Sequence, residues 1–322
     1  MFRYLVAAAG LAAAVVALAN SAPAQTYPTR PIRLVVPFAA GSATDTLARV
    51  LGQKLAAAEG WNVVIENMAG ASGMLAAQNV ARAAPDGHTI FVTSNTTHAA
   101  NQNLFKKLTY DPVGDFEPVG KLGTITLALA VHPSVPASNT KELIAYGKAN
   151  PGKLSFGSGS SSSRIAGEML KTLAGFDMLH VPYKSNPMAV TDLLGGQISL
   201  VFADISTTLP QIRAGKVKGF GVSSAQRSPL APDLPTMVEE GVPGYELTAW
   251  FAAFVPAKTP KPIVDKLNAE LRRAIAVPEI KDKLENMGGD PRATTPAEMR
   301  ALVASQLATW TRLAKEASIS IE

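Results

Sequence analysis

Short apolar runs alternate along this sequence with segments whose apolar residues recur at helical spacing. Residues 34–36 have the uninterrupted apolar character of a strand buried on both faces, and residues 47–55 show one apolar helical face. This alternation predicts parallel strands joined by right-handed crossovers. The expected strands are 34–36, 61–65, 89–93, 127–131, 153–156, 180–183, 198–203, 220–222 and 248–255. The expected helices after the first are 74–83, 140–149, 164–173, 188–194, a short one after 206–208, 262–276, 279–286 and 296–317.

The turn after the first predicted strand has the composition of an anion site. Gly41 frees the backbone for a tight turn, and Ser42 and Asp45 have the spacing of a helix N-cap box. Such a turn directs unpaired backbone N–H groups to one place above the carboxyl edge of the sheet, which favours anions. An ordinary strand–helix connection gives the same pattern, and Asp45 suits capping better than ligand contact. The return of strand, small polar loop and helix at 153–173 favours the binding interpretation.

Five predicted loops fall at carboxyl ends of the expected parallel strands, namely 38–45, 94–98, 158–164, 185–187 and 204–208. Ligands of open α/β sheets bind at that edge. The loops are rich in Ser, Thr, Asn and Gly, which provide hydroxyl, amide and backbone donors without fixed charge. The candidate ligand-binding residues are Phe38, Ala39, Gly41, Ser42, Asp45, Ser94, Thr96, Thr97, Ser158, Gly159, Ser160, Ser161, Ser162, Arg164, Asn186, Ala203 and Asp204.

Several of these candidates have a plain structural alternative. Arg164 is suited to bidentate binding of a carboxylate, yet an exposed arginine in a first helical turn is about as common. The serines at 160–163 also fit a flexible linker, although their place between strand and helix argues against it. Asp204 is suited either to orient a polar ligand group or to cap the next helix. Trp250 and Phe251 fit an aromatic pocket, but core packing is commoner.

Length, composition and charge limit the class of protein. With 322 residues, of which 47% are hydrophobic and 17% charged, the chain is long enough for two domains with packed cores. The net charge is +5, but the basic residues are scattered and do not alternate with aromatic ones, so we expect no nucleic-acid partner. A mildly basic surface attracts anionic solutes. The chain has no cysteine, which excludes disulfide and thiol chemistry.

The first 24 residues have the pattern of a secretory signal peptide. Arg3 supplies the positive start, residues 5–18 the apolar run, and Ala22-Pro23-Ala24 the small residues that place cleavage before Gln25. An uncleaved membrane anchor is the weaker alternative, because the run is shorter than the roughly 20 residues that span a bilayer. We therefore expect an exported chain from which this segment is removed.

The motifs of several enzyme classes are missing. The sequence has no Gly-x-Ser-x-Gly elbow and no Walker phosphate loop, and Gly157-Ser-Gly159 lacks the third glycine of a dinucleotide fingerprint. His88, His98, His132 and His180 show no metal-ligand spacing, although His98 lies in a candidate site loop. We therefore expect no metal and no cofactor. Because a fold can assemble catalytic groups that are distant in sequence, an exported hydrolase or isomerase acting in the same cleft remains the alternative.

Several short motifs, taken in order, resemble those of one family. They are Val36-Pro-Phe-Ala-Ala-Gly41 with Asp45, Pro85-Asp-Gly87, His180-Val-Pro-Tyr-Lys184, Leu193-Leu-Gly-Gly196, Ala214-Gly-Lys216, Leu234-Pro-Thr236 and Gly241-Val-Pro-Gly244. No single motif is decisive, but the ordered set is specific and covers essentially the whole chain after the signal peptide. On these residues the sequence resembles the tripartite tricarboxylate transporter substrate-binding proteins, often called Bug receptors.

The resemblance implies an α/β, two-domain, periplasmic binding protein-like fold of the Venus flytrap type. Each domain would be a mostly parallel sheet flanked by helices. We expect one domain to comprise 25–126 plus 247–322 and the other 127–246, joined by a hinge near Leu127 and Leu247. Loops 38–45 and 158–164 would face each other across the cleft, with a contribution from the loop at Asp204, and hinge closure would bury the ligand.

The resemblance also implies a role without catalysis. The protein would capture a small-molecule carboxylate in the periplasm, either a di- or tricarboxylate, an acidic amino acid or an aromatic carboxylate. It would deliver this ligand to the membrane permease of a tripartite transporter, and a signalling partner in place of the permease is an alternative. We expect a monomer. Many members have a longer glycine-rich loop and a histidine where residues 160–164 stand. Here, Arg164 and the donors of 158–162 are expected to clamp one carboxylate, with Gly41 and Ser42 contacting the ligand from the other domain.

Overall fold

The computed structural model describes residues 27–286, 288–317, 319 and 321. The predicted signal peptide, residues 1–24, lies outside them and stays a prediction. The chain divides into a short unit, Met1–Arg30, and a second unit, Pro31–Glu322. Every helix and strand of the described residues belongs to the second unit.

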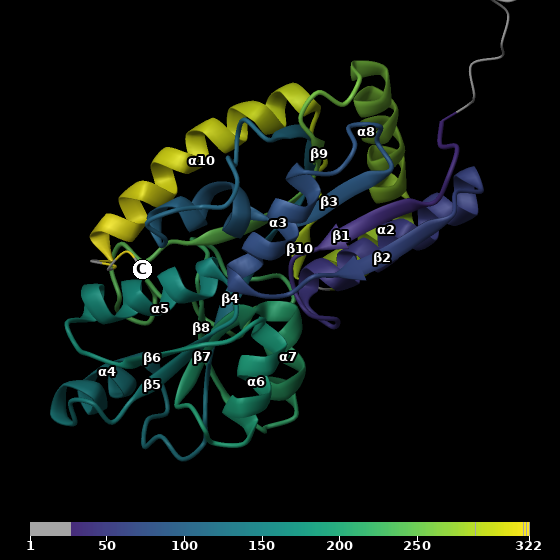
Figure 1. Cartoon of the computed structure of the whole chain (residues 1–322). Helices are drawn as coiled ribbons and strands as arrows, with labels where there is room; N and C mark the ends of the chain where they lie inside the picture. Colours follow the sequence, from purple (N-terminus) through teal and green to yellow (C-terminus); the bar gives the residue numbers. More distant parts are fainter. Residues whose placement is uncertain (1–26, 287, 318, 320, 322) are drawn as a thin grey trace, which may run out of the picture. The chain divides into compact units, whose positions relative to one another are not determined.

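Strands and helices alternate along most of the second unit, as the hydrophobic pattern predicts (Figure 1). The strands are β1 (Ile32–Val36), β2 (Val63–Asn67), β3 (Thr89–Ser94), β4 (Phe116–Val131), β5 (Ser155–Ser158), β6 (Leu179–Pro182), β7 (Leu200–Asp204), β8 (Lys218–Val222), β9 (Thr248–Pro256) and β10 (Gly289–Asp290). The helices are α2 (Ala43–Glu59), α3 (Met74–Ala81), α4 (Thr140–Ala149), α5 (Ser161–Ala174), α6 (Asn186–Leu194), α7 (Ile205–Arg213), α8 (Lys261–Ala276), α9 (Pro278–Glu285) and α10 (Pro296–Glu316). Short helical turns cover Ala71–Gly73, Thr96–Ala100 and Asn101–Asn103.

The strands form one mixed sheet in the order β2-β1-β3-β9-β4-β7-β5-β6, with β8 and β10 also paired to β4. The expected parallel pairing is confirmed for the three strands at each end, where β1 pairs with β2 and β3, and β5 pairs with β6 and β7. Strands β4 and β9 are antiparallel to their neighbours because they run between the two sets and do not belong to a strand–helix–strand unit.

Strand β4 passes through both parts of the sheet. Up to Thr126 it pairs with β9, and from Leu127 onward it pairs with β7 and β8. We call β1, β2, β3, β9, β10 and β4 up to Thr126 the first half of the sheet, and the remaining strands the second half. The sequence predicted only the apolar end of β4, because its earlier part carries two glycines. Gly120 and Gly123 lie where the register with β9 shifts, and a side chain there would press on backbone oxygens of Thr294 and Asp290.

Helices cover both faces of the second half of the sheet, which explains the uninterrupted apolar runs of its strands. Leu200 and Phe202 of β7 belong to the buried cluster that contains Met169 of α5. The alternate residue Val201 belongs to a separate cluster with Leu193 of α6. Because successive side chains of a strand point to opposite faces, both faces need apolar residues.

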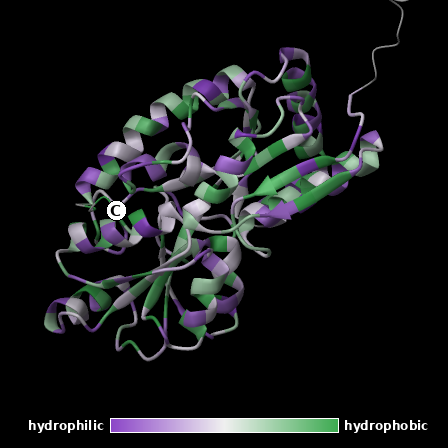
Figure 2. Cartoon of the chain, in the orientation of Figure 1, coloured by the Kyte–Doolittle hydropathy of each residue, from purple (hydrophilic) through white to green (hydrophobic). Residues whose placement is uncertain are grey.

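The first half of the sheet is covered in the same way. Helix α2 packs against β1 and β2, and α8 packs against α2 and β4. Val35 and Phe91 share a buried cluster with Val80 of α3 and Met299 of α10. Figure 2 shows hydrophobic and hydrophilic residues alternating along α10, as expected of a helix with one buried and one exposed face.

Candidate functional site

The loops at the carboxyl ends of the parallel strands meet at one cavity. Its lining consists of Phe38, Ser42, Thr44, Ser94, Gly159, Ser160, Ser162, Asn186, Asp204, Ala249 and Phe251. Each of the five loops singled out from the sequence contributes at least one of these residues, and β9 adds the last two. The cavity therefore lies where the two halves of the sheet come together.

Four helices, α2, α5, α6 and α7, begin beside this cavity. Ser42 caps α2 by accepting a hydrogen bond from the backbone N–H of Asp45 at 3.2 Å, and Ser160 caps α5 by accepting one from Ser163 at 3.2 Å. Residues 161–163, expected to lie in a loop, form the first turn of α5, because Ser160 is a favourable N-cap residue. The first N–H groups of a helix have no carbonyl partner within that helix, so the cavity beside these four helix starts favours anions.

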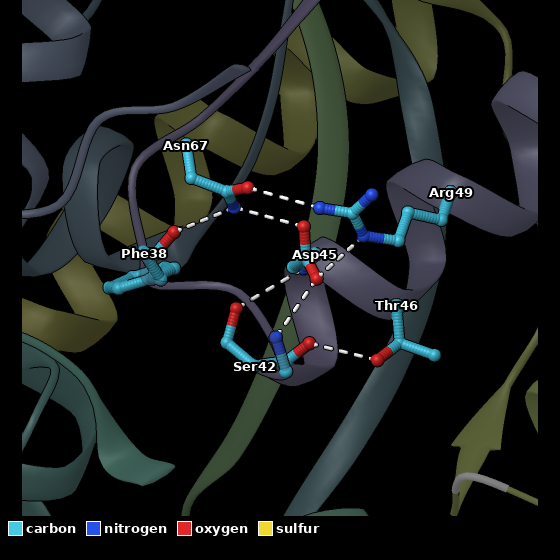
Figure 3. Close-up of polar contacts among 7 residues, drawn as sticks. Phe38, Ser42, Asp45, Thr46, Arg49 and Asn67 are labelled. Atoms are coloured by element: carbon cyan, nitrogen blue, oxygen red, sulfur yellow. Dashed lines mark hydrogen bonds and ion pairs between the residues drawn. The ribbon is translucent and has the colours of Figure 1, made fainter. Parts of the chain in front are cut away.

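Asp45 holds the loop after β1 in shape and does not line the cavity (Figure 3). Its Oδ2 accepts hydrogen bonds from the backbone N–H of Gly41 at 2.9 Å and from Arg49 Nε at 3.0 Å. Its Oδ1 accepts one from Asn67 Nδ2 at 2.9 Å, and the same Asn67 group donates to the Phe38 carbonyl at 3.0 Å. The Asp45 carboxylate thus accepts from the loop, from Arg49 and from Asn67, and the side chain that caps α2 is that of Ser42.

The electrostatics of Asp45 favour its charged form. Burial by itself would raise the pKa of this carboxyl group, but the hydrogen bonds from Arg49, Gly41 and Asn67 outweigh burial, with a further Coulombic contribution from Arg49, and the pKa lies below its usual value. The same ion pair raises the pKa of Arg49. Asp45 thus fixes Ser42 and Phe38, which do line the cavity, without exposing its own charge to it.

Asn186 and Asp204 form a polar wall of the cavity together with Gly159. Asn186 Oδ1 accepts a hydrogen bond from the backbone N–H of Gly159 at 3.0 Å, and Asn186 Nδ2 donates to Asp204 Oδ2 at 3.2 Å. Asp204 occupies the N-cap position of α7, but its side chain makes no capping hydrogen bond there. Of the two roles that the sequence left open, the cap is therefore not formed. A Cβ at Gly159 would overlap the backbone of Ser185 and Asn186, so only glycine fits there.

Two buried hydrogen bonds link the residues after β3 to the first turn of α5. Asn95 Nδ2 donates to Ser162 Oγ at 2.8 Å, and Ser161 Oγ donates to Asn101 Oδ1 at 2.6 Å. Asn95 Oδ1 also accepts from the backbone N–H of Trp250 at 3.2 Å. These contacts join the first half of the sheet to the second beside the cavity. The sequence analysis did not single out Asn95 or Asn101, because an asparagine inside a polar loop carries no distinctive signal.

The other candidate residues lie near the cavity without lining it. These residues are Ala39, Gly41, Asp45, Thr96, Thr97, Ser158, Ser161, Arg164 and Ala203. Thr97 is buried and its Oγ1 lies 2.7 Å from Thr93 Oγ1 and 2.9 Å from His98 Nδ1. The His98 ring stacks on Phe254 in the core, with 3.7 Å between the ring centroids. Burial lowers the pKa of His98 to about 3.

Arg164, the expected carboxylate clamp, is not among the residues that line the cavity. Ser158 Oγ lies 2.7 Å from His180 Nε2. Burial, followed by the charges of Arg164 and Lys171, lowers the pKa of His180 to about 4. Neither Ser158 nor His180 lines the cavity.

Thr44, Ala249 and Phe251 line the cavity but were not among the candidates. Thr44 is the second residue of α2, where nothing in the sequence distinguishes it. Ala249 and Phe251 belong to an apolar strand whose residues read as core, and Phe251 is indeed 6% exposed. Trp250 does not line the cavity, and its Nε1 donates to Gln306 Oε1 at 3.2 Å.

Comparison with known proteins gives consistent results. The sequence profile of the tripartite tricarboxylate transporter family receptors matches residues 47–319. Rpa4515 of R. palustris, solved with adipate, is 34% identical over 92% of this chain and 100% of that chain, with a TM-score of 0.89. The periplasmic binding protein BugD is 36% identical over 92% of this chain and 100% of that chain, with a TM-score of 0.87. MatC from Rhodopseudomonas palustris, solved with bound malate, is 35% identical over 89% of this chain and 100% of that chain, with a TM-score of 0.85.

These matches confirm two of the sequence-based expectations. The mixed sheet with flanking helices is the fold of the periplasmic binding proteins, since the similarity extends over about nine-tenths of the chain. The protein belongs to the tripartite tricarboxylate transporter receptor family.

Proposed function

We propose that this protein is a periplasmic receptor that captures a small carboxylate and delivers it to the membrane permease of a tripartite transporter. Membership of the receptor family supports the receptor role. Two relatives that share the fold over most of the chain were solved with carboxylates, one with adipate and one with malate. The geometry of the cavity supports the same class of ligand.

The convergence of four helix starts on one cavity carries this proposal. Among the described residues that line it there is no lysine, arginine or histidine, so its attraction for anions comes from backbone N–H groups and hydroxyl groups. A carboxylate accepts hydrogen bonds from such donors at both oxygens. Ser42, Ser94 and Ser162 supply hydroxyl groups, and Phe251 supplies an apolar surface for a short carbon chain.

The receptor would work by closure of two domains, 25–126 plus 247–322 and 127–246. β4 passes between the halves of the sheet at Thr126 and Leu127, and the chain returns near Leu247, where its N–H bonds to the Ser223 carbonyl at 2.8 Å. Opening about these two connections would separate Asn95 from Ser162 and admit ligand. Closure would restore this contact and exclude water from the carboxylate.

We propose further that the cavity carries out no reaction. The pair formed by Ser158 and His180 is the arrangement that favours the hydrolase alternative, since a neutral imidazole within hydrogen-bond distance of a serine can act as its base. Neither residue lines the cavity, so a ligand held there would lie away from this pair. Among the described residues, the cavity lining offers one carboxylate, Asp204, and no second acid or base beside it.

Localisation and assembly complete the proposal. Among the described residues, no helix is both long enough and apolar enough to cross a membrane. Export through the predicted signal peptide, with cleavage before Gln25, would place the protein in the periplasm.

We propose that the exported protein is a monomer, and light scattering on the purified protein tests its oligomeric state. Deletion of its gene, followed by growth on the bound carboxylate as sole carbon source, separates delivery to a permease from signalling.

A thermal-shift screen against a panel of carboxylates tests the receptor function. A ligand at 100 times its dissociation constant adds about 2.7 kcal/mol to the free energy of unfolding. We expect one class of carboxylate to raise the melting temperature, and NMR of the incubated mixture to show the ligand unchanged. A new product would favour the enzyme. If no carboxylate shifts the melt even after unfolding and refolding to remove co-purified ligand, the carboxylate assignment is wrong.

Ser42→Ala supplies the matched variant for this screen. It removes a hydroxyl group that faces the cavity and caps α2, so we expect about tenfold weaker binding. Ser305→Ala removes a hydroxyl group from the exposed face of α10 and is the control, with unchanged affinity expected. Equal affinity of Ser42→Ala and the parent protein would place the ligand elsewhere.

A further inference from the structure

One described residue in the cavity lining has an ionisable side chain at neutral pH, and it is an acid. Asp204 ends β7 and contributes a carboxylate to a cavity whose other polar groups are hydroxyls, backbone and the amide of Asn186. A site for a carboxylate ligand would gain nothing from a negative charge of its own. We therefore expect the ligand to place a hydrogen-bond donor, neutral or positively charged, beside Asp204.

The hydrogen-bond geometry shows what Asp204 lacks. The backbone N–H of Gly159 can only donate, so Asn186 Oδ1 is its acceptor and the Nδ2 group of Asn186 must face Asp204. The donors that the described residues give to the Asp204 side chain are this neutral amide and the backbone N–H of Asp204 itself. A carboxylate has about four acceptor positions, so these two donors leave acceptor capacity for a further donor from the ligand.

Without such a donor, burial disfavours the charged form of Asp204. Burial raises the pKa of Asp204, and the hydrogen bond from Asn186 offsets this only in part. A ligand with carboxylates alone would add negative charge in the same small cavity and would further disfavour the charged form of Asp204. A ligand that also brings a hydroxyl or ammonium group would donate a hydrogen bond to Asp204 and stabilise its charged form. Such a ligand would therefore bind more tightly than the plain diacid.

We propose that Asp204 selects carboxylates that also carry a hydrogen-bond donor, a hydroxyl or an ammonium group, by accepting that donor while the helix starts hold the carboxylate. This inference rests on the proposed carboxylate-receptor function. If Asp204 selects in this way, the ligands are hydroxy acids or amino acids, and unsubstituted dicarboxylates bind poorly. Asn186, held by Gly159, positions the Asp204 carboxylate for this contact.

Titration calorimetry on the purified exported protein, unfolded and refolded to remove bound ligand, tests this selection. The probes are two series of equal chain length: succinate, malate and aspartate, then glutarate, 2-hydroxyglutarate and glutamate. We expect a donor-bearing member to bind at least about tenfold more tightly than the plain diacid of its series. Comparison within each series distinguishes a hydroxyl from an ammonium donor.

The variant Asp204→Asn keeps the shape of the side chain and removes its charge. We expect it to reduce the ratio of affinities within a series to less than about threefold, whereas Ser42→Ala weakens every member together and leaves the ratio in place. Equal binding of plain and donor-bearing diacids, or an unchanged ratio in Asp204→Asn, overturns the inference and leaves the carboxylate receptor intact. Binding of no member of either series also overturns the inference, whereas only a flat melt across the whole carboxylate panel overturns the receptor function, so the two failures differ.

Discussion

Asn95 Nδ2 donates a hydrogen bond to Ser162 Oγ over 2.8 Å and so joins the end of β3 to the first turn of α5. Asn95 is fully buried and also accepts from the backbone N–H of Trp250. This one side chain therefore links β9, in the first half of the sheet, to α5, which packs on the second half.

The first prediction concerns this contact. Asn95→Ala leaves the Trp250 N–H without its buried acceptor, so we expect the free energy of unfolding to fall by about 1–3 kcal/mol. Ser162→Ala should weaken ligand binding too, because Ser162 lines the cavity. Urea unfolding of both single variants and of the double variant measures their coupling. Additive losses would show that the two side chains act independently in solution.

The second prediction concerns the loop of Figure 3. Asp45→Ala removes the acceptor of Gly41, Arg49 and Asn67, and we expect a loss of about 2–3 kcal/mol in the free energy of unfolding together with weaker ligand binding. Because the pKa of Asp45 is lowered in the folded protein, this contribution is present above the ordinary carboxyl pKa and is lost as the pH falls through the folded value.

An exposed pair of the same spacing is the control for Asp45. Asp265 pairs with Lys261 on the surface of α8, and Asp265→Ala should change stability by less than about 0.5 kcal/mol. Similar losses in Asp45→Ala and Asp265→Ala would contradict the role assigned to the buried carboxylate.

The third prediction concerns Gly159. Gly159→Ala forces a Cβ into the backbone of Ser185 and Asn186, and Asn186 must move away from Asp204. We expect loss of ligand binding and a lower melting temperature. In Gly195→Ala the new Cβ would lie 3.7 Å from its nearest neighbours, an ordinary contact, so this variant should bind normally. Normal binding by Gly159→Ala would show that the loop relaxes.

The fourth prediction concerns pH. Burial lowers the pKa of His98 from 6.5 to about 3, so the unfolded chain takes up a proton below pH 6.5 that the folded protein does not. Stability is therefore lost as the pH falls from 6.5 toward 3, and His98 contributes about 2 kcal/mol of loss by pH 5. His98→Phe keeps the stacking on Phe254, and its free energy of unfolding should fall less between pH 7.5 and pH 5. Parallel pH curves for the two proteins would contradict this assignment.

The fifth prediction concerns Arg164. The sequence favoured it as a carboxylate clamp, but it is not among the residues that line the cavity. We expect Arg164→Ala to change ligand affinity by less than about threefold, whereas a bidentate contact would be worth about tenfold or more. Titration calorimetry of the parent protein and Arg164→Ala with the same carboxylate measures this difference. A tenfold loss of affinity would show that Arg164 does contact the carboxylate.

The elements that could be predicted from the sequence are those whose periodicity is set by burial. β1, β3 and β7 are apolar on both faces, and α2 and α10 show one apolar face, so their patterns suffice. The early part of β4 escaped prediction because Gly120 and Gly123 interrupt its pattern for the sake of close backbone contacts. The five loops were predictable as a set because the carboxyl ends of parallel strands share an edge.

The individual contacts within the site depended on distances that no sequence pattern contains. Whether Ser160 began a helix or ended a loop depended on its hydrogen bond to Ser163. Whether Arg164 faced the cavity depended on its angular position on α5, and a shift of the helix start by three residues moves that position by most of a turn. Asn95 could not be identified, because its two partners, Ser162 and Trp250, are far from it in the sequence, at separations of 67 and 155 positions.

The helix starts around the cavity have a consequence for how this binding site changes over time. Main-chain N–H groups are present whatever side chain a residue carries, so exchange of a lining side chain that leaves the backbone in place alters the size and chemistry of the accepted molecule without removing these groups. A protein built in this way can acquire a new cargo by small steps while remaining a carboxylate binder. Loss of the general affinity requires a change that moves the backbone itself, as expected for Gly159→Ala.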